Sequence, residues 1–292
     1  MKVSIITCTI RDQFMENVFM NYEQQQWDEK ELIIILNKDE LNLSMWQKEA
    51  EKYQNVRVFQ LHEGATLGDC LNFGILKANY DYIAKFDDDD CYGPNYLSNS
   101  MKVFKNDGVS IVGKSSYYVY FTNKKALMLI QNKENTYDET VSGATLIFRK
   151  EVYNNVQFQK RTRAEDYFFI EDCKKNGYKI FTTTKDDFVV IRHDSGNHTW
   201  KIEDDDFLTW GETIAYTDDF KSVLPGFKRP PIKKEKPSSQ NSKLVSENNS
   251  KEKALALREV YKTMLNHTLQ QHQNQDYTEY IRSKYFNKTR SL

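Results

Sequence analysis

The sequence predicts an α/β fold with a central, mostly parallel sheet that is flanked by helices. Strand and helix patterns alternate four times in the first hundred residues, which is typical of parallel strands joined by crossover helices. Residues 32–36 read Leu-Ile-Ile-Ile-Leu, an unbroken apolar run that favours a strand covered on both faces. Another strand-like run, residues 82–86, ends abruptly in four consecutive aspartates at 87–90.

The elements of the first half follow from the spacing of apolar residues. Short β-branched or apolar runs mark strands, whereas apolar residues on one helical face, such as Phe14, Val18 and Tyr22, mark the first helix. Ser44 is expected to cap the second helix, because its hydroxyl can accept a hydrogen bond from the first turn. The expected elements are a strand at 3–8, a helix to about 26, a strand at 32–36, a helix at 44–53, a strand at 56–59, a helix entered at 66–76 and a strand at 82–86.

The second half alternates less regularly, which favours a mixed sheet. An acidic pair, Glu165 and Asp166, opens an apolar helix that is expected to end near Asn176 and Gly177. The helix dipole favours acids in a first turn, so this pair could also be a simple capping feature. The further strands expected here are 109–120, 126–130, 142–149 and, as the last one, 189–191, which leads into a polar and aromatic loop at 192–200.

The composition changes after Leu224 and predicts three parts: an α/β domain at 1–224, a flexible linker at 225–250 and an amphipathic helical tail at 251–292. The linker is rich in Lys, Ser and Asn and has no apolar periodicity. The tail has apolar residues at helical spacing. It could form a homo-oligomer, dock back on the α/β domain or bind a partner helix, and we prefer the first interpretation.

Charge and composition argue against several classes of protein. The 41 Lys and Arg against 42 Asp and Glu leave a net charge of −1, so no global field attracts nucleic acid or an anionic membrane. No apolar segment approaches the roughly 20 residues of a membrane span, and the N-terminal run is too short for a signal peptide. The four cysteines lack C-x-x-C spacing, which argues against a zinc site and a secreted disulfide framework. We therefore expect a cytoplasmic protein.

Polar residues follow three of the expected strands, at 7–11, 37–39 and 87–90. The carboxyl ends of parallel strands share one edge of the sheet, and ligands bind there. Adjacent carboxylates repel one another, and a divalent cation with oxygen ligands relieves the repulsion. Because side chains alternate along a strand, we expect Asp87 and Asp89 to share a face and hold one metal ion. A solvated acidic turn is the alternative.

Several motifs together resemble family-two glycosyltransferases of the GT-A fold. They are the stretch Asp-Asp-Asp-Asp-Cys-Tyr at 87–92 with Pro94 shortly after it, the helix start at 67–74, and Glu165-Asp166. The resemblance covers about residues 1–210 and is closest to bacterial members that build cell-wall, capsule or spore-surface glycans. It implies a metal-dependent inverting enzyme that moves a sugar from a nucleotide-diphosphate donor, with a UDP-sugar as the leading expectation, to a hydroxyl on a glycan, polymer or surface molecule.

The resemblance also implies a donor site. Asn37 stands where the family more commonly has Asp to read the base, and this departure leaves the base preference open. The side chains assigned to donor binding are Thr7, Thr9, Arg11, Asn37, Asp39, Asn72, Asp87 and Asp88.

A divalent metal, Mn²⁺ or Mg²⁺, is expected to neutralise the charge that develops on the leaving diphosphate. Asp89 is the first expected ligand and Asp87 the second. His193 is the third, since some relatives supply a histidine from a late loop. His198 is the alternative ligand or a diphosphate contact, and Trp200 either stacks on a sugar ring or belongs to the core.

Inverting transfer needs a general base that takes the proton of the acceptor hydroxyl. The resemblance places Asp166 in this role and Glu165 beside it, where it orients the acceptor or the loop. Ala164 precedes them where relatives often have glycine. Lys85 either offsets the repulsion between the acids or reaches solvent from the strand end, and we prefer the second interpretation. His62 is expected to be a solvated or partly buried side chain without a partner motif.

Two other classes of protein remain as alternatives. A nucleotidyltransferase uses similar acids for its metal and diphosphate chemistry. A catalytically silent scaffold would bind a sugar nucleotide or glycan and leave the function to the tail. The joint presence of Asp87, Asp89 and Asp166 argues against the scaffold, because a binding module needs no base.

Overall fold

Two sheets carry the fold in the computed structural model, which describes residues 1–106, 108–193 and 202–227. The strands are β1 (Val3–Thr9), β2 (Lys30–Leu36), β3 (Val56–Gln60), β4 (Tyr82–Lys85), β5 (Cys91–Tyr92), β6 (Val109–Gly113), β7 (Tyr117–Phe121), β8 (Ala126–Ile130), β9 (Thr136–Tyr137), β10 (Ile147–Arg149), β11 (Lys179–Thr182), β12 (Phe188–Arg192) and β13 (Glu212–Tyr216). The α-helices are α1 (Met15–Glu23), α2 (Leu43–Ala50), α3 (Leu67–Lys77), α4 (Tyr96–Met101), α5 (Glu165–Lys175), α6 (Asp204–Leu208) and α7 (Phe220–Val223). Short 3-10 turns are η1 (Asp12–Phe14), η2 (Lys102–Lys105), η3 (Gly143–Thr145), η4 (Lys150–Asn154) and η5 (Pro225–Phe227).

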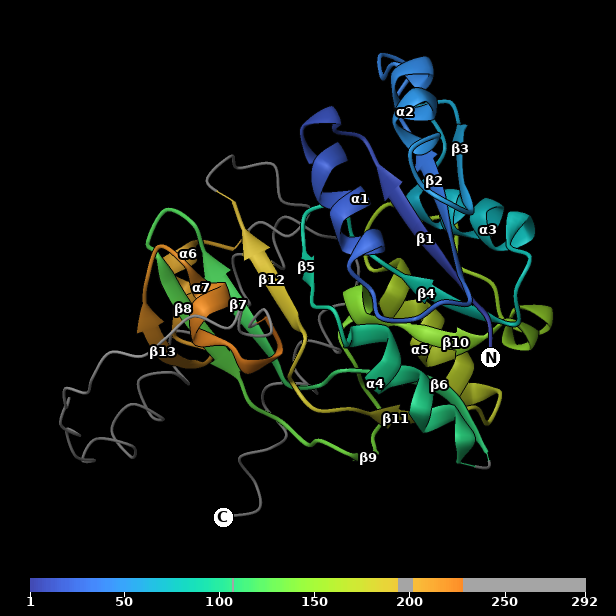
Figure 1. The fold of residues 1–292 in the computed structure, drawn as a ribbon. Coiled ribbons are helices and arrows are strands. Elements are labelled where there is room, and N and C mark those ends of the chain that lie inside the picture. Colours follow the sequence, from blue (N-terminus) through green and yellow to red (C-terminus); the bar gives the residue numbers. More distant parts are fainter. Residues whose placement is uncertain (107, 194–201, 228–292) are drawn as a thin grey trace, which may run out of the picture. The chain divides into compact units, whose positions relative to one another are not determined.

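The larger sheet has eight strands in the order β3-β2-β1-β4-β10-β6-β11-β9 (Figure 1). Its first four strands are parallel, whereas β10 runs antiparallel to both of its neighbours. The smaller sheet has the order β13-β8-β7-β12-β5 and is mixed. The α/β fold class and the mostly parallel first half are therefore confirmed, as is the mixed character of the second half.

Helices cover both faces of the parallel strands, which explains the unbroken apolar run in β2. On one face Ile5 belongs to a core that includes Phe19 of α1 and Trp46 of α2. On the other face Ile6 belongs to a core that includes Leu71 of α3 and Phe169 of α5. Residues 32–36 are all at most 1% exposed, so each side chain of this run is inside one of the two cores.

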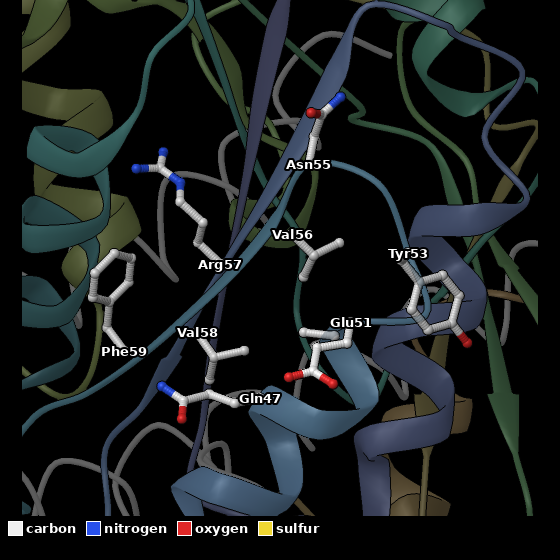
Figure 2. Close-up of a pocket in the computed structure, with 9 residues that line it drawn as sticks. Gln47, Glu51, Tyr53, Asn55, Val56, Arg57, Val58 and Phe59 are labelled. Carbon is white, nitrogen blue, oxygen red and sulfur yellow. The ribbon is translucent and has the colours of Figure 1, made fainter.

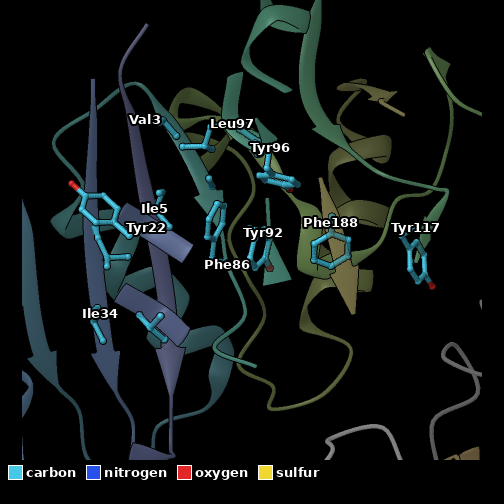
Figure 3. Close-up of a cluster of buried hydrophobic side chains, with 14 of the residues drawn as sticks. Val3, Ile5, Tyr22, Ile34, Phe86, Tyr92, Tyr96, Leu97, Tyr117 and Phe188 are labelled. Carbon is cyan, nitrogen blue, oxygen red and sulfur yellow. The ribbon is translucent and has the colours of Figure 1, made fainter. Parts of the chain in front are cut away.

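An aromatic cluster joins the two sheets beside the acidic stretch at 87–90. Phe86, directly before the acids, stacks on Tyr92 with ring centroids 3.8 Å apart. Tyr92 in turn contacts Tyr96 at 5.0 Å and Phe188 of β12 at 5.0 Å. Figure 3 shows this core continuing from β1 and β2 to Phe188 and Tyr117. The residues on either side of the acids are therefore fixed by rigid packing.

Some expectations for individual elements were wrong. Asn42, and not Ser44, caps α2, because its side chain accepts from the backbone N of Met45 at 3.0 Å. The expected strand at 109–120 is two strands, β6 and β7, which belong to different sheets. The expected last strand, β12, is followed by a further strand, β13, which has no apolar run to mark it because its five residues are mostly exposed. The two-residue strands β5 and β9 are too short to show a period.

Part of the expected organisation after Leu224 lies outside the described residues. Residues 225–227 form the turn η5, and the remaining linker and the tail at 251–292 are not among the residues that the structure describes. Within the described ranges, no helix combines the length and the apolar character needed to cross a membrane.

A pocket of about 560 Å³ lies between α2 and the edge strand β3 (Figure 2). None of the residues that line it is among the site residues expected from the sequence. They are Gln47, Ala50, Glu51, Tyr53, Asn55, Val56, Arg57, Val58 and Phe59. This pocket is therefore separate from the candidate active site.

Close packing of α3 on β1 depends on Gly74, and this contact gives a stability prediction. An ideal Cβ at Gly74 would lie 2.7 Å from Cγ2 of Ile6, which is too close for a packed core. We expect Gly74→Ala to lower the free energy of unfolding by about 1–3 kcal/mol, measured by urea denaturation. Leu76→Ala on the same helix is the control, since Leu76 is 68% exposed and its loss should change stability by about 0.5 kcal/mol or less. Equal midpoints for the two variants would contradict the packing argument.

Candidate active site

The loop after β1 is bonded to the acidic stretch after β4. Thr9 donates from Oγ1 to Oδ2 of Asp88 over 2.5 Å and accepts from the backbone N of Arg11 at 3.0 Å. The guanidinium of Arg11 forms an ion pair with Asp88, and its Nη2 lies 2.9 Å from Oδ2 of Asp89. The ends of the first and fourth strands, which the sequence predicted to share an edge, therefore meet in one hydrogen-bonded network.

The four aspartates lie in a turn and not in a strand, because β4 ends at Lys85. Asp88 and Asp90 are nevertheless buried, whereas the side chains of Asp87 and Asp89 are 35% and 18% exposed. The expected division of the acids into two pairs is present, although the strand geometry given as its reason was wrong. Asp87 and Asp89 are the pair that a ligand can reach.

Burial strongly affects the two inner acids. It raises the pKa of Asp88 to about 6, and Asp89 adds to the rise while Arg11 and Thr9 oppose it. Burial also raises the pKa of Asp90 well above its usual range, with Asp89 and Asp87 adding to the effect. Both shifts favour the protonated forms of Asp88 and Asp90, which reduces the repulsion within the turn.

Two asparagines of α1 hold the acidic turn, and the sequence analysis missed both. Asn17 donates from Nδ2 to the carbonyl oxygens of Asp88 and Asp90, each at 2.8 Å. Asn21, which is 1% exposed, donates to the same carbonyl of Asp90 at 2.8 Å. One signal in the sequence could have revealed them: Asn17 and Asn21 are four residues apart, beside the apolar Val18 and Tyr22 on the same helix. A buried amide needs a polar partner, so amides next to an apolar face indicate a contact elsewhere in the fold.

Lys85 is only 5% exposed, so the prediction that it reaches solvent was wrong. It belongs to β4, an inner strand of the larger sheet between β1 and β10. Its Nζ forms an ion pair with Asp87. Burial alone would lower the pKa of Lys85, but Asp87, Glu165 and Asp166 together raise it above its ordinary value.

The acid pair lies in the first turn of α5, and its two members have different surroundings. Glu165 is buried at 5% exposure, whereas Asp166 is half-buried. Ala164, directly before them, has a φ of 57° and is left-handed. This conformation costs a non-glycine residue about 1–2 kcal/mol. Of the two acids that follow, Asp166 is the more accessible to solvent.

The turn η3 connects the acid pair with the acidic stretch. The Oη of Tyr92 accepts from the backbone N of Asp87 at 2.8 Å and donates to the carbonyl of Ala144 at 2.7 Å. Gly143, the first residue of η3, lies against Asp166, and an ideal Cβ there would be 1.5 Å from Oδ2 of that aspartate. Both acidic motifs therefore border the same short turn.

His193 lies at the acidic stretch, as expected. Its Nε2 is 3.3 Å from the carbonyl oxygen of Asp89, and its ring centroid is 4.9 Å from that of Phe14. Phe14 was not anticipated as a neighbour. His198 and Trp200, the other residues named for this loop, lie outside the described residues.

The residues expected to read the base lie together at the ends of β2 and β3. The Nδ2 of Asn37 donates to the carbonyl of His62 at 3.0 Å, and its backbone N donates to the carbonyl of Thr9 at 2.8 Å. Asp39 accepts from the backbone N of Glu63 at 3.2 Å and lies 3.3 Å from Nε2 of His62. The side chain of His62 is 79% exposed, as expected for a solvated histidine, although its contact with Asp39 was not anticipated.

Two of the residues assigned to donor binding, Asn72 and Thr7, make contacts within the fold. The amide of Asn72 is bonded on both sides to the backbone of Phe158, at 2.8 and 3.0 Å. It fastens α3 to the segment before α5. Thr7 is 2% exposed within β1.

Residues 4–176 of the sequence match the family described as Glycosyl transferase family 2. The chain belongs to this family. Its fold is the GT-A fold of glycosyltransferases, as the resemblance implied. No curated protein matches the chain.

Solved structures share the fold of this family 2 domain. Residues 1–349 of TarS from S. aureus, in complex with UDP-GlcNAc, are 15% identical with a TM-score of 0.55, over 72% of this chain and 64% of TarS 1–349. The same part of TarS in another crystal structure has 14% identity and a TM-score of 0.53, over 65% and 60%. The mannosyltransferase PcManGT from Pyrobaculum calidifontis, in complex with GDP-Man and Mn²⁺, has 15% identity and a TM-score of 0.51, over 68% and 59%. The chain thus spans less than two thirds of each of these structures.

The expected metal ligands of this glycosyltransferase domain are engaged by side-chain cations. Arg11 pairs with Asp89 and Lys85 with Asp87, and in the described part of the chain no three His, Cys, Asp or Glu side chains are arranged to hold a metal ion. The donor types still fit, because half-buried carboxylates beside an imidazole suit Mn²⁺ or Mg²⁺. A metal would compete with Arg11 and Lys85 for these oxygens.

The buried acid of the pair gives a pH-dependent stability prediction. Burial raises the pKa of Glu165 to about 8, with Asp166 adding to the rise and Lys85 opposing it. Between about pH 4.3, the pKa of an unperturbed Glu, and about pH 8, the folded domain keeps a proton that the unfolded chain has lost. Stability contributed by protonated Glu165 is therefore lost as the pH rises through this window.

We expect Glu165→Gln, which stays neutral, to gain stability over the natural protein as the pH rises from 5 to 8. Thermal unfolding at pH 5 and at pH 8 measures how the Tm difference between the variant and the natural protein changes. Glu171→Gln on the same helix is the control, since Glu171 makes a partly exposed ion pair with Lys174. A difference that is the same at both pH values would rule out a buried, protonated Glu165.

Proposed function

We propose that the chain is an inverting glycosyltransferase that moves a sugar from a nucleotide-diphosphate donor to an acceptor hydroxyl. The observation that carries this proposal is the meeting of two acidic motifs on η3. Tyr92 bonds both Asp87 and η3, while Gly143 of the same turn leaves room for Asp166. A donor diphosphate at Asp87 and Asp89 would thus place its sugar near a half-buried carboxylate, and family membership supports this reaction class.

The chemistry assigned to this chain is a single displacement. Asp166 takes the proton of the acceptor hydroxyl, whose oxygen attacks the anomeric carbon while the bond to the diphosphate breaks on the opposite face. The anomeric configuration inverts as a result. Burial raises the pKa of Glu165 to about 8, so this residue holds a proton at neutral pH and is not assigned the role of base.

We propose a UDP-sugar as the donor. TarS structures with UDP and with UDP-GlcNAc share the fold and support this choice, whereas the GDP-Man complex of PcManGT represents the alternative base. Asn37, Asp39 and His62 would contact the base, and Thr9 and Arg11 would lie along the nucleoside. Asn72 and Thr7 would act indirectly: Asn72 fastens α3 to the segment before α5, and Thr7 is buried within β1.

A divalent metal is part of the proposal, with Mn²⁺ in the PcManGT structure as support. Asp89, Asp87 and His193 would hold it. The metal would neutralise the charge of the departing diphosphate. For the acceptor we propose a hydroxyl on a glycan, polymer or other molecule of the cell envelope, and for the tail at 251–292 a role in self-association.

Donor and metal binding can be tested together by thermal shift. We expect UDP-sugars with Mn²⁺ to raise Tm. A ligand at 100 times its Kd stabilises the folded state by about 2.7 kcal/mol. For a domain of this size, each kcal/mol raises Tm by roughly 2–4 °C. Asp89→Asn should lose the part of the shift that requires Mn²⁺. If no sugar nucleotide stabilised the natural protein, the donor proposal would fail and a scaffold role would be favoured.

The base is tested by Asp166→Asn. We expect sugar transfer to fall by about 10²–10⁴-fold, the usual contribution of a general base, while the Kd for the donor is unchanged. Glu171→Gln on the same helix is the matched control and should transfer normally. The natural enzyme should release a nucleoside diphosphate, whereas release of pyrophosphate would indicate a nucleotidyltransferase. Retention of most activity by Asp166→Asn would remove it from the role of base.

A further inference from the structure

A basic segment, residues 160–163, lies directly before the acid pair of α5. Positions 152–164 contain no acid and three cations, which are Lys160, Arg161 and Arg163. The side chain of Arg161 is half-buried, whereas those of Lys160 and Arg163 are exposed. Positive charge is thus concentrated next to the proposed base, in a chain whose net charge is −1.

The backbone of the basic segment is held by α3. The backbone N of Gly68 donates to the carbonyl of Arg161 at 2.9 Å. An ideal Cβ at Gly68 would lie 1.9 Å from the carbonyl oxygen of Gln159, so α3 approaches the segment as closely as only a glycine allows. Asn72 fastens the backbone of Phe158, just before the segment, at 2.8 and 3.0 Å. The three cations therefore extend from a fixed backbone.

The guanidinium of Arg161 is packed, yet it has no polar partner in the described part of the chain. Its Cζ lies 3.6 Å from the ring centroid of Phe168 of α5, a contact that holds the planar group against the ring. The described arginines whose guanidinium makes an ion pair or a hydrogen bond are Arg11, Arg57, Arg149 and Arg192. Within the same ranges, Arg161 and Arg163 are the two that make neither. The edge of a stacked guanidinium keeps N–H groups that match the oxygens of a phosphate or carboxylate.

We propose that the basic segment binds an anionic group of the acceptor, so that the acceptor carries a phosphate or carboxylate beside the hydroxyl that receives the sugar. The inference rests on the proposed function and adds the charge of the acceptor to it. The acceptor attacks from the face opposite to the diphosphate, so residues beside the base belong to the acceptor side. Arg163 precedes Asp166 by three residues, which keeps their α-carbons within about 11 Å of each other. Its charge would offset the repulsion between an anionic acceptor and the carboxylate of Asp166.

The first test measures sugar transfer by the full chain to three acceptors of similar length: a glycerol phosphate oligomer, an oligogalacturonate and a neutral maltooligosaccharide. We expect one of the two anionic acceptors to have a KM at least about tenfold below that of the neutral one, because a hydrogen bond to a charged group contributes this much. Added salt should weaken the preference, since it screens exposed charges. The two anionic acceptors distinguish phosphate from carboxylate. Equal use of charged and neutral acceptors would overturn the proposal.

The second test replaces the two arginines one at a time. Arg161→Gln and Arg163→Gln should each raise the KM for the preferred anionic acceptor by about tenfold, while kcat and the donor Kd change by less than about threefold. An unchanged acceptor KM in both variants would overturn the proposal. Weaker donor binding would overturn it as well, because the arginines would then serve the diphosphate.

Lys48→Gln is the matched control, since it removes one positive charge from an exposed position of α2. Helix α2 packs on one face of the larger sheet and α5 on the other. The control should leave the acceptor KM in place. A rise in KM shared by Lys48→Gln would show a general effect of net charge and would contradict a site at the basic segment.

Folding and binding measurements cover the remaining outcomes. If Arg161→Gln did not fold, Arg163→Gln would decide alone, because that side chain is exposed. If the natural protein transferred sugar to none of the acceptors, the proposed function would fail, and calorimetry with the two anionic oligomers would decide the anion site separately. Binding that weakens in Arg163→Gln supports the site, and absence of binding by both oligomers overturns it.

Discussion

The crowding of carboxylates at the end of β4 is the constraint on which the rest of the site depends. Four consecutive aspartates and the acid pair of α5 meet two side-chain cations, Arg11 and Lys85. Two of the aspartates are buried and have raised pKa values, so burial favours their protonated forms, while Arg11 and Lys85 pair with acids of the same turn. Arg11 comes from the loop after β1 and Lys85 from β4, and the electrostatic requirement thus ties together segments that are distant in sequence.

Rigid apolar packing makes this arrangement possible. The acids lie between Phe86 and Tyr92, whose stacked rings belong to a core that extends into both sheets (Figure 3). Asn17 and Asn21 hold the backbone of the turn from the opposite side. The backbone of the turn is therefore held from two sides by packing and hydrogen bonds. A rigid backbone lowers the reorganisation that binding requires, although a metal would still have to displace Arg11 and Lys85 from the carboxylates.

The sequence predicted the parallel half of the fold well because its signals are local. Unbroken apolar runs and helical periodicity fixed β1 to β4 and their helices, and a parallel sheet brings their carboxyl ends to one edge. The partners of Arg11 and Lys85 were not predictable in the same way. Such pairs depend on how deeply a side chain is enclosed, and enclosure depends on elements that are distant in the sequence. By its position alone Lys85 is a lysine at the end of a strand, whereas in the fold it is 5% exposed. Asn17 carried a weak signal, since an amide on an apolar helix face needs a partner somewhere.

Gly143 is a position where one substitution would affect the proposed chemistry more than the fold. Its α-carbon lies so close to Asp166 that one methyl group would occupy the space of the carboxylate. The turn that contains Gly143 also receives the hydroxyl of Tyr92 through the neighbouring carbonyl, so its backbone cannot simply move away. In a descendant of this chain, alanine at position 143 would displace Asp166, the proposed base, while both sheets and the acidic turn could remain. Position 143 is therefore where a search for inactive members with the same fold should begin.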